Sequence, residues 1–498
     1  MKKIIILFFA LVADPGFGQN WQNICSPGTT FYKDLNANLK AFRRDSFGLA
    51  GNNDTIFFSY LTIRDSLNMS GICYDTSNGS VLGNKVYKKH DGWFYFFNKY
   101  HDTIFINSQA SLNSNWKFCK LPNNCRIQAT VIAISTDSLP GTTDLVKIIE
   151  LQAKDNGNNN ISNILNQKQI KLSQHYGLTK MLDVIYIPAD TMMYFFAGKS
   201  TPQTGLLDIT WLDIYGFNVG DIFHYEWYYQ STNGDASRST IKKVLNKTVL
   251  GNNDTLIYTI EECYKLYSQN GTGEFHDTIV ETYVNGTFYP LNTLTMCLPE
   301  EFHPGNFIGQ LNWSNLYFAN VASYNQRLTK GVRFNYFKYY PGCWEYGIFE
   351  NYEEYRYTNG LGLTYSWEWE VGGGGGLWTD QTEELIYFKK GNETWGIPLS
   401  ADCNTFVGIE NDSKTIIPGV HISPNPVETR AEIIIEGFQT NDIFHYILHN
   451  YSGNSVRSGT MNSSPFTFNR GELLAGLYLL SVFDKKDNLR GRMKIIIQ

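Results

Sequence analysis

Residues 477–482 read Leu-Tyr-Leu-Leu-Ser-Val, a run of branched and aromatic side chains that is too short for a helix and typical of a strand. Three further runs of this kind lie in the same part of the chain, at 433–435, 444–448 and 493–497. Turn-forming residues separate these runs, at Gly437, 451–454, Gly471 and 484–488. Short strands joined by tight turns predict a small antiparallel β-sandwich over residues 420–498.

Pro424-Asn425-Pro426 lies at the entry of this segment. Neither proline has a backbone N–H, so neither can occupy a central strand, and the motif marks the junction between a linker and the sandwich. We expect the linker to span residues 404–419 and to be the place where the chain bends and is cleaved.

The order of several residues in this segment matches a known family of export signals. The segment resembles the C-terminal sorting domain of type IX (Por) secretion substrates. The matching positions are Pro424, Asn425, Pro426, Gly453, Gly476, Tyr478 and Lys494. The resemblance implies recognition by the outer-membrane type IX machinery, and then release or attachment to surface lipopolysaccharide. The alternative is an ordinary terminal accessory module.

The first 18 residues have the pattern of a secretory signal peptide. Lys2 and Lys3 precede ten apolar residues, and the small-residue pattern 16–18 predicts cleavage before Gln19. The apolar run is too short for a membrane anchor, which needs about 20 residues. We therefore expect a protein that passes through the periplasm to the cell surface or the medium, with no integral membrane segment in the mature chain.

Composition favours sheets throughout the chain. Of 498 residues, 15% are aromatic and only 18% are charged, and the formal net charge is −6. Strand-like runs recur in the centre, at 130–134, 145–151, 184–187, 221–229 and 255–264. The fold class that we predict is all-β, a large antiparallel β-sheet region followed by a small C-terminal β-sandwich. The acidic charge argues against nucleic acid as a partner.

Two short sequence motifs each occur twice in the central region. Gly-Asn-Asn-Asp-Thr occurs at residues 51–55 and again at 251–255, and His-Asp-Thr-Ile occurs at 101–104 and 276–279. Each copy is interpreted as a hairpin turn that leads into a strand. The 200-residue offset suggests two β-rich halves of unknown function, residues 19–205 and 206–403.

Eight cysteines in a chain with a signal peptide predict disulfides rather than zinc ligands, because no C-x-x-C or Cys/His cluster is present. The most local pair, Cys119 and Cys125, brackets a turn and is the first bridge expected. Order along the chain suggests three others, although spacing alone does not fix connectivity. These pairs are Cys25 with Cys73, Cys263 with Cys297, and Cys343 with Cys403.

Asp followed by Ser or Thr and then by Ile, Leu or Met occurs seven times. The pattern resembles the O-glycosylation acceptor motif of bacteria that use type IX secretion. The acceptor positions that this implies are Thr55, Ser66, Thr103, Ser138, Thr191, Thr255 and Thr278. The alternative is that Asp-Thr simply starts strands after turns. A glycan requires a surface position.

Sequence motifs for catalysis are missing. The chain has no G-x-S-x-G, H-E-x-x-H, phosphate loop or dinucleotide glycine pattern, and its nine histidines are scattered. Residues 365–371, Tyr-Ser-Trp-Glu-Trp-Glu-Val, place Trp367 and Trp369 on one face and Glu368 and Glu370 on the other. Two carboxylates on one strand do not flank a substrate as glycosidase carboxylates do. We interpret the strand as a packed aromatic face and a solvated acidic face.

These observations predict no catalytic residues, no cofactor and no metal. The central region is expected to be a non-catalytic β-rich binding or adhesion module, with an extracellular glycan as a possible ligand. An extracellular hydrolase acting on polysaccharide or protein, without a recognisable motif, is the alternative. Residues 219–226 and 387–396 also resemble segments of β-rich proteins that carry this tail, a resemblance that implies no activity.

Overall fold

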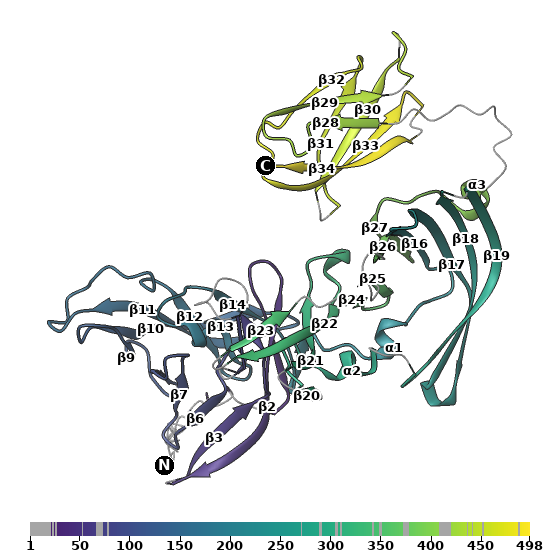
Figure 1. Cartoon of the computed structure of the whole chain (residues 1–498). Helices are drawn as coiled ribbons and strands as arrows, with labels where there is room; N and C mark the ends of the chain where they lie inside the picture. Colours follow the sequence, from purple (N-terminus) through teal and green to yellow (C-terminus); the bar gives the residue numbers. More distant parts are fainter. Residues whose placement is uncertain are drawn as a thin grey trace, which may run out of the picture.

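The computed structural model describes residues 21–407 and 420–498 apart from short internal gaps. The gaps are residues 22–23, 25–26, 52, 66–72, 77–78, 270, 288–290, 304–306, 309–310, 341–342, 348–350, 372–377, 436, 441, 451–452 and 487–488. The signal peptide, Cys25, Ser66 and residues 408–419 of the predicted linker lie outside the described residues. The protein is all-β, as predicted, with two large antiparallel sheets followed by a small sandwich (Figure 1).

The first large sheet has 13 strands and is nearly closed, because its first and last strands meet. Trp116 of β9 donates its indole N–H to the carbonyl of Phe105 in β8 at 2.8 Å. Its interior is a core of alternating residues such as Phe94, Phe96 and Ile127. In spatial order the strands are β8 (Thr103–Asn107), β7 (Trp93–Phe97), β6 (Lys85–Lys88), β3 (Asp54–Ser59), β2 (Leu39–Ala50), β1 (Thr29–Lys33), β14 (Met193–Ser200), β13 (Gly177–Leu182), β12 (Gln169–Ser173), β11 (Thr142–Lys154), β10 (Arg126–Leu139) and β9 (Asn115–Lys120), with β15 (Gln203–Gly205) beside β14.

The second large sheet has 14 strands, and its long hairpins curve around a second core. Tyr215 and Phe217, which follow α1 (Trp211–Ile214), pack into this core beside Tyr258 and Tyr283. In spatial order the strands are β19 (Gly271–Val284), β18 (Thr255–Ser268), β17 (Ala236–Leu250), β16 (Ile222–Ser231), β26 (Trp378–Lys390), β25 (Gly362–Val371), β24 (Asn351–Thr358), β22 (Thr329–Tyr340), β23 (Cys343–Gly347), β5 (Cys73–Asp75) and β4 (Arg64–Asp65), with β21 (Leu311–Asn320) beside β22, β20 (Phe307–Ile308) beside β21 and β27 (Glu393–Gly396) beside β26.

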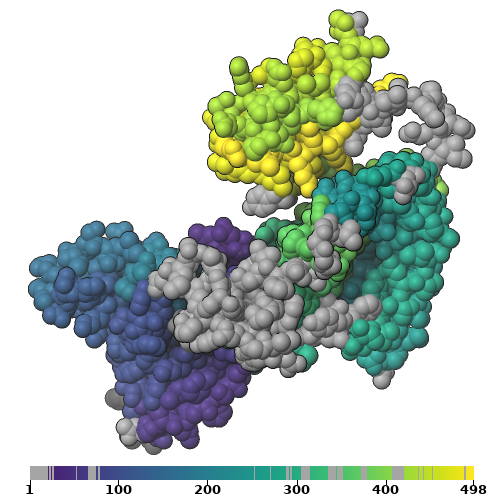
Figure 2. Space-filling model, in the orientation of Figure 1, coloured from purple at the N-terminus to yellow at the C-terminus, as the bar shows by residue number. Residues whose placement is uncertain are grey.

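The C-terminal segment is a sandwich of a three-stranded and a four-stranded sheet with a core of its own. Figure 2 shows it as a separate lobe beside the second large sheet. Val427, Ile433, Leu448, Leu480 and Ile495 are fully buried within it. The strands are β28 (Val420–Ser423), β29 (Arg430–Ile435) and β32 (Phe466–Asn469) in one layer, and β31 (Ser455–Met461), β30 (Phe444–Asn450), β33 (Gly476–Asp484) and β34 (Leu489–Ile497) in the other.

The first half of the chain is not confined to the first sheet. After β3 it crosses to the second sheet, where it forms β4 and β5, and then returns to form β6. Thr62 and Asn38 form isolated backbone bridges with Glu301 and Asn320, respectively. The short helices and 3-10 turns lie in the connections. They are η1 (Val184–Tyr186), η2 (Gly251–Asn253), α2 (Leu291–Met296), η3 (Tyr324–Gln326) and α3 (Cys403–Val407).

Two local predictions are wrong. Residues 184–187 are not a strand, because the side chain of Asp183 accepts from the N–H of Ile185 and caps a 3-10 turn. The second His-Asp-Thr copy, at 276–278, is not a turn, because Asp277 pairs with Glu262 in the middle of β19. Both Gly-Asn-Asn-Asp-Thr copies do connect hairpin strands, β2 to β3 and β17 to β18.

Three of the four predicted disulfide pairs are wrong, and the fourth, Cys25–Cys73, includes a residue outside the described part of the chain. Cys119 and Cys125 are free, because backbone hydrogen bonds between Leu121 and Cys125 close the turn and Cys119 packs into the first core. Among the described residues a bridge joins Cys263 to Cys403, so neither Cys263–Cys297 nor Cys343–Cys403 exists. It fixes α3 to β18, and residues 404–407 of the predicted linker are therefore helical.

Candidate functional site

Several of the predicted sorting residues lie beside the last strand, β34. The Asn425 side chain donates to the carbonyl of Lys494 and accepts from the N–H of Ile496, each at 2.9 Å. Val427 and Ile497 continue this contact as a parallel backbone bridge. The Pro-Asn-Pro motif therefore holds the C-terminal strand in place.

Three other residues of the pattern have separate structural roles in the sandwich. Gly453 turns the chain between β30 and β31 with φ 78°, a conformation that suits glycine. Gly476 opens β33 opposite Ile497. The hydroxyl of buried Tyr478 donates to the carbonyl of Leu474 at 2.9 Å.

A cavity of about 680 Å³ separates the sandwich from the second sheet. Gly453, Tyr478 and Lys494 line one side, and Tyr228 lines the other. The Lys494 ammonium lies 5.9 Å from the centroid of the Tyr228 ring. Three positions of the family pattern thus face the central region across one space.

The six described acceptor positions for O-glycosylation all reach the surface to some degree. Ser138 and Thr278 are exposed, and Thr55, Thr103, Thr191 and Thr255 are half-buried. This exposure permits the modification, which stays a prediction.

The acidic face of β25 is not simply solvated, contrary to the prediction. Glu368 is half-buried and lies opposite Glu353 of β24. The Tyr355 hydroxyl donates to Glu368 at 2.7 Å and lies 3.4 Å from Glu353, and Gln381 also donates to Glu368. Burial and the charge of Glu368 raise the pKa of Glu353. Glu353 could not be predicted from the sequence, because its contact with Glu368 depends on the register of the hairpin.

This carboxylate pair does not resemble a glycosidase dyad. Glycosidase carboxylates stand about 5 to 9.5 Å apart with the scissile bond between them. Here the Tyr355 hydroxyl occupies the space between Glu353 and Glu368. The arrangement offers hydrogen-bond acceptors on a sheet surface and is suited to binding.

The same face continues onto β16 and β17. Cross-strand partners share a face of a sheet, and Trp227 lies opposite both Glu383 and Arg238. Arg238 lies 5.6 Å from the Trp227 ring centroid and 3.2 Å from Glu383. We call Trp227, Arg238, Glu353, Glu368 and Glu383 the aromatic-acidic face. Aromatic rings beside hydrogen-bonding carboxylates are a surface chemistry that suits sugars and polar partners.

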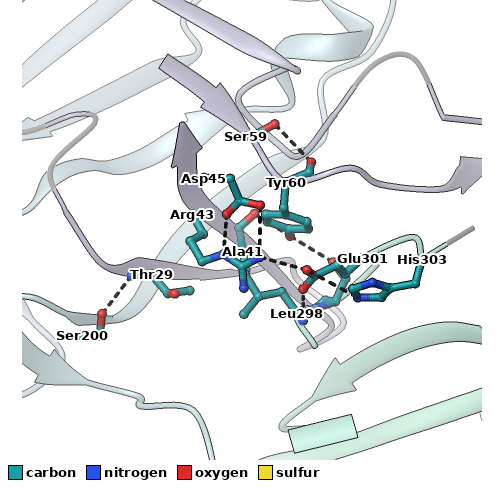
Figure 3. Close-up of polar contacts among 11 residues, drawn as sticks. Thr29, Ala41, Arg43, Asp45, Ser59, Tyr60, Ser200, Leu298, Glu301 and His303 are labelled. Carbon is teal, nitrogen blue, oxygen red and sulfur yellow. Dashed lines mark hydrogen bonds and ion pairs between the residues drawn. The ribbon is translucent and has the colours of Figure 1, made fainter. Parts of the chain in front are cut away.

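A second polar cluster lies where the two large sheets meet (Figure 3). Arg43 of β2 donates to Asp45 at 2.6 Å and to Glu301 at 2.9 Å, and Glu301 also accepts from the N–H of Leu298. The Tyr60 hydroxyl contacts the carbonyls of Ala41 and Pro299 at 3.0 Å. The segment that follows α2 is therefore fixed against β2.

Two more residues belong to this cluster. The Cys297 sulfur lies 3.3 Å from Nε2 of His303, and the same nitrogen lies 3.6 Å from Glu301. Burial and the charge of Glu301 raise the pKa of the Cys297 thiol to about 11. In the sequence His303 is one of the scattered histidines, although the spacing Cys297-x3-Glu301-x-His303 is present in the chain.

Comparisons with known proteins add little. No family model matches the chain, and no curated protein matches it. Two solved structures align with 95% of the chain, the extracellular domains of a putative one-component system and of a putative hybrid two-component system, both BT4673 from B. thetaiotaomicron. They are 8% and 9% identical and are covered to 85% and 98%, with TM-scores of 0.13 and 0.12. Structural similarity at this level supports no conclusion about the fold or the function of this chain. Among the described residues, no helix is long and apolar enough to cross a membrane.

Proposed function

We propose that the chain is exported to the cell surface or the medium and that residues 420–498 are its type IX sorting signal. The observation that carries the proposal is the pair of hydrogen bonds that the Asn425 side chain forms, donating to the Lys494 carbonyl and accepting from the Ile496 N–H. They join the two ends of the family pattern in one module that has its own core. The Cys263–Cys403 disulfide supports an oxidising compartment.

Export by the tail is testable with a reporter. Residues 404–498 are fused to a signal peptide and a fluorescent protein, and surface and medium fractions are compared in a strain with type IX secretion and a sister strain without it. The fusion should leave the periplasm only in the first strain, and Asn425→Ala should reduce its export. Asn462→Ala, at another exposed asparagine of the sandwich, is the matched control. Equal export in both strains would overturn the proposal.

For the central region we propose binding of an extracellular glycan or polar partner at the aromatic-acidic face. The supporting observation is that Tyr355 and Gln381 hold Glu368 as a fixed acceptor on the same sheet face as Trp227. A glycan array probed with the mature chain tests this. Trp227→Ala and Glu368→Gln should lose binding. Trp378→Ala, whose position in β26 alternates to the opposite face, should retain it.

The alternative, an extracellular hydrolase, has its own outcome in the same experiment. Arrayed polysaccharides that bind are incubated with the chain, and released sugars are measured. Product release that Glu353→Gln abolishes would replace the binding proposal with hydrolysis.

We also propose O-glycosylation at one or more of the acceptor positions. The exposure of Thr278 and Ser138 supports it. Intact-mass measurement of the secreted protein should give a product that starts at Gln19 and exceeds its sequence mass by sugar units. A mass equal to that of the polypeptide would exclude the modification.

A further inference from the structure

We propose that Cys297, Glu301 and His303 form a binding site for a divalent transition metal, Zn²⁺ being the ion whose chemistry fits best. One ligand atom from each residue lies within 4.8 Å of the other two. The sulfur-to-nitrogen distance is 3.3 Å and the nitrogen-to-oxygen distance is 3.6 Å. Ligands at about 2.0 to 2.3 Å from a tetrahedral zinc stand roughly 3.5 Å apart, so the two measured distances already match that spacing.

The backbone holds the three residues in this arrangement. Glu301 forms a bridge with Thr62, and the N–H of Phe302 donates to the carbonyl of Leu61 at 2.9 Å. One carboxylate oxygen of Glu301 accepts from the N–H of Leu298 at 2.7 Å, which leaves the other oxygen facing His303. A metal would therefore meet a site that needs little rearrangement.

Arg43 supports the site and does not block it. Its guanidinium contacts the Glu301 oxygen that faces His303, but a carboxylate oxygen has two lone pairs and can accept a hydrogen bond while it binds a metal. Arg43 is itself paired with Asp45, so its charge is already balanced. A thiolate and a carboxylate together neutralise a divalent ion.

The three ligands differ in burial, so the site is shielded on one side and open to solvent on the other. Cys297 and Glu301 are buried, whereas 57% of the His303 side chain is exposed. Three protein ligands leave a fourth position for water on the exposed side, as in open zinc sites. Sulfur and imidazole ligands disfavour Ca²⁺ and Mg²⁺, which prefer oxygen.

A second group of potential ligands serves as an internal comparison. Glu261, His276 and Cys403 also lie close together, but Cys403 is bonded to Cys263 and has no thiolate to offer. His276 contacts Glu261 at 3.0 Å, so its surroundings resemble those of His303 apart from the free sulfur. His276→Ala is therefore a matched control for His303→Ala.

The test uses the full mature chain, stripped of metal and then titrated with Zn²⁺ against a chromophoric chelator, with Ca²⁺ as the negative ion. One Zn²⁺ should bind per chain, His303→Ala should weaken binding at least tenfold, and His276→Ala should leave it unchanged. Co²⁺ should give a thiolate-to-metal charge-transfer band that Cys297→Ala removes. His303→Ala changes an exposed side chain, so a folded variant is expected.

Zinc should also protect one specific sulfur. Alkylation mapped by mass spectrometry should be slower at Cys297 in the presence of Zn²⁺, with no change at Cys125, which is free and partly exposed. The proposal is overturned if Zn²⁺ does not bind stoichiometrically, if the Co²⁺ complex lacks the thiolate band, or if both histidine variants lose affinity equally.

Discussion

Arg64 and Asp183 form a buried ion pair that joins the two large sheets, with Nη2 of Arg64 2.6 Å from the Asp183 carboxylate. Arg64 begins β4 of the second sheet, and Asp183 caps η1 beside the first sheet. Glu300 lies on the other side of the same guanidinium at 3.3 Å. Burial alone would raise the pKa of Glu300, but Arg64 and Lys40 outweigh it and lower that pKa. The chain crosses between sheets at this point, so the charges stabilise the crossing.

Arg64→Met is expected to destabilise the protein strongly. The change leaves Asp183 and Glu300 buried without their cation, and removal of one partner of a buried pair costs about 3 to 5 kcal/mol. Lys171→Met is the control, because it breaks a partly exposed pair with Asp137 that is worth about 1 kcal/mol or less. Chemical denaturation of the two variants gives the comparison. Equal losses of unfolding free energy in the two variants would contradict a stabilising role for the buried charges at the crossing.

The disulfide has a separate prediction. Cys263 and Cys403 are 140 residues apart, and closing a loop of that length restricts the unfolded chain, so Cys403→Ser should lower stability by about 2 to 5 kcal/mol. Cys125→Ser should have little effect, since that thiol is free. Thermal unfolding with and without reductant distinguishes the two. Reductant should shift the wild-type midpoint toward that of Cys403→Ser.

Local patterns in the sequence predicted the strands well. The four predicted runs of the sandwich fall within β29, β30, β33 and β34. Their signal is local, because branched and aromatic side chains favour extended backbone wherever they occur. The strand predicted at residues 184–187 failed because the Asp183 side chain competes locally for the backbone N–H.

The candidate sites depend on contacts between different parts of the chain, which a local sequence pattern does not predict. Glu353 meets Glu368 only through the register of a hairpin, and Cys263 lies beside Cys403 because α3 packs against β18. Order along the chain therefore predicted the wrong bridges. Cys297 and His303 are close in sequence, but their convergence requires the bridge between Glu301 and Thr62, which comes from a distant strand.

Stability should fall in mild acid because of His224. Its ring is buried and accepts from the N–H of Leu399 at 2.9 Å, and burial together with Arg492 lowers its pKa to about 4. The pKa of an unfolded histidine is about 6.5, so between pH 6.5 and 4 the unfolded chain binds more protons. The stability that neutral His224 contributes is therefore complete above pH 6.5 and is lost as the pH falls toward 4. The unfolding free energy falls by up to about 3 kcal/mol over this range.

The variant that isolates this effect is His224→Asn, which retains an acceptor near Leu399 but does not titrate. Denaturation at pH 4.5 and pH 7.5 should show a larger loss of unfolding free energy for the wild type than for the variant. If both proteins lose the same amount, the acid sensitivity belongs to other groups.

The last prediction concerns the two hydrogen bonds between the Asn425 side chain and the C-terminal strand, β34. Asn425→Ala removes two hydrogen bonds to β34, each worth about 1 kcal/mol, so residues 489–498 should open more often while the rest of the sandwich stays folded. Hydrogen exchange read by mass spectrometry should show faster exchange in peptides from β34 and little change in β29 or β30. Asn462→Ala, whose side chain lies in the exposed turn before β32, should exchange like the wild type. Unchanged exchange in Asn425→Ala would mean that the backbone bridge between Val427 and Ile497 holds the strand without the side chain.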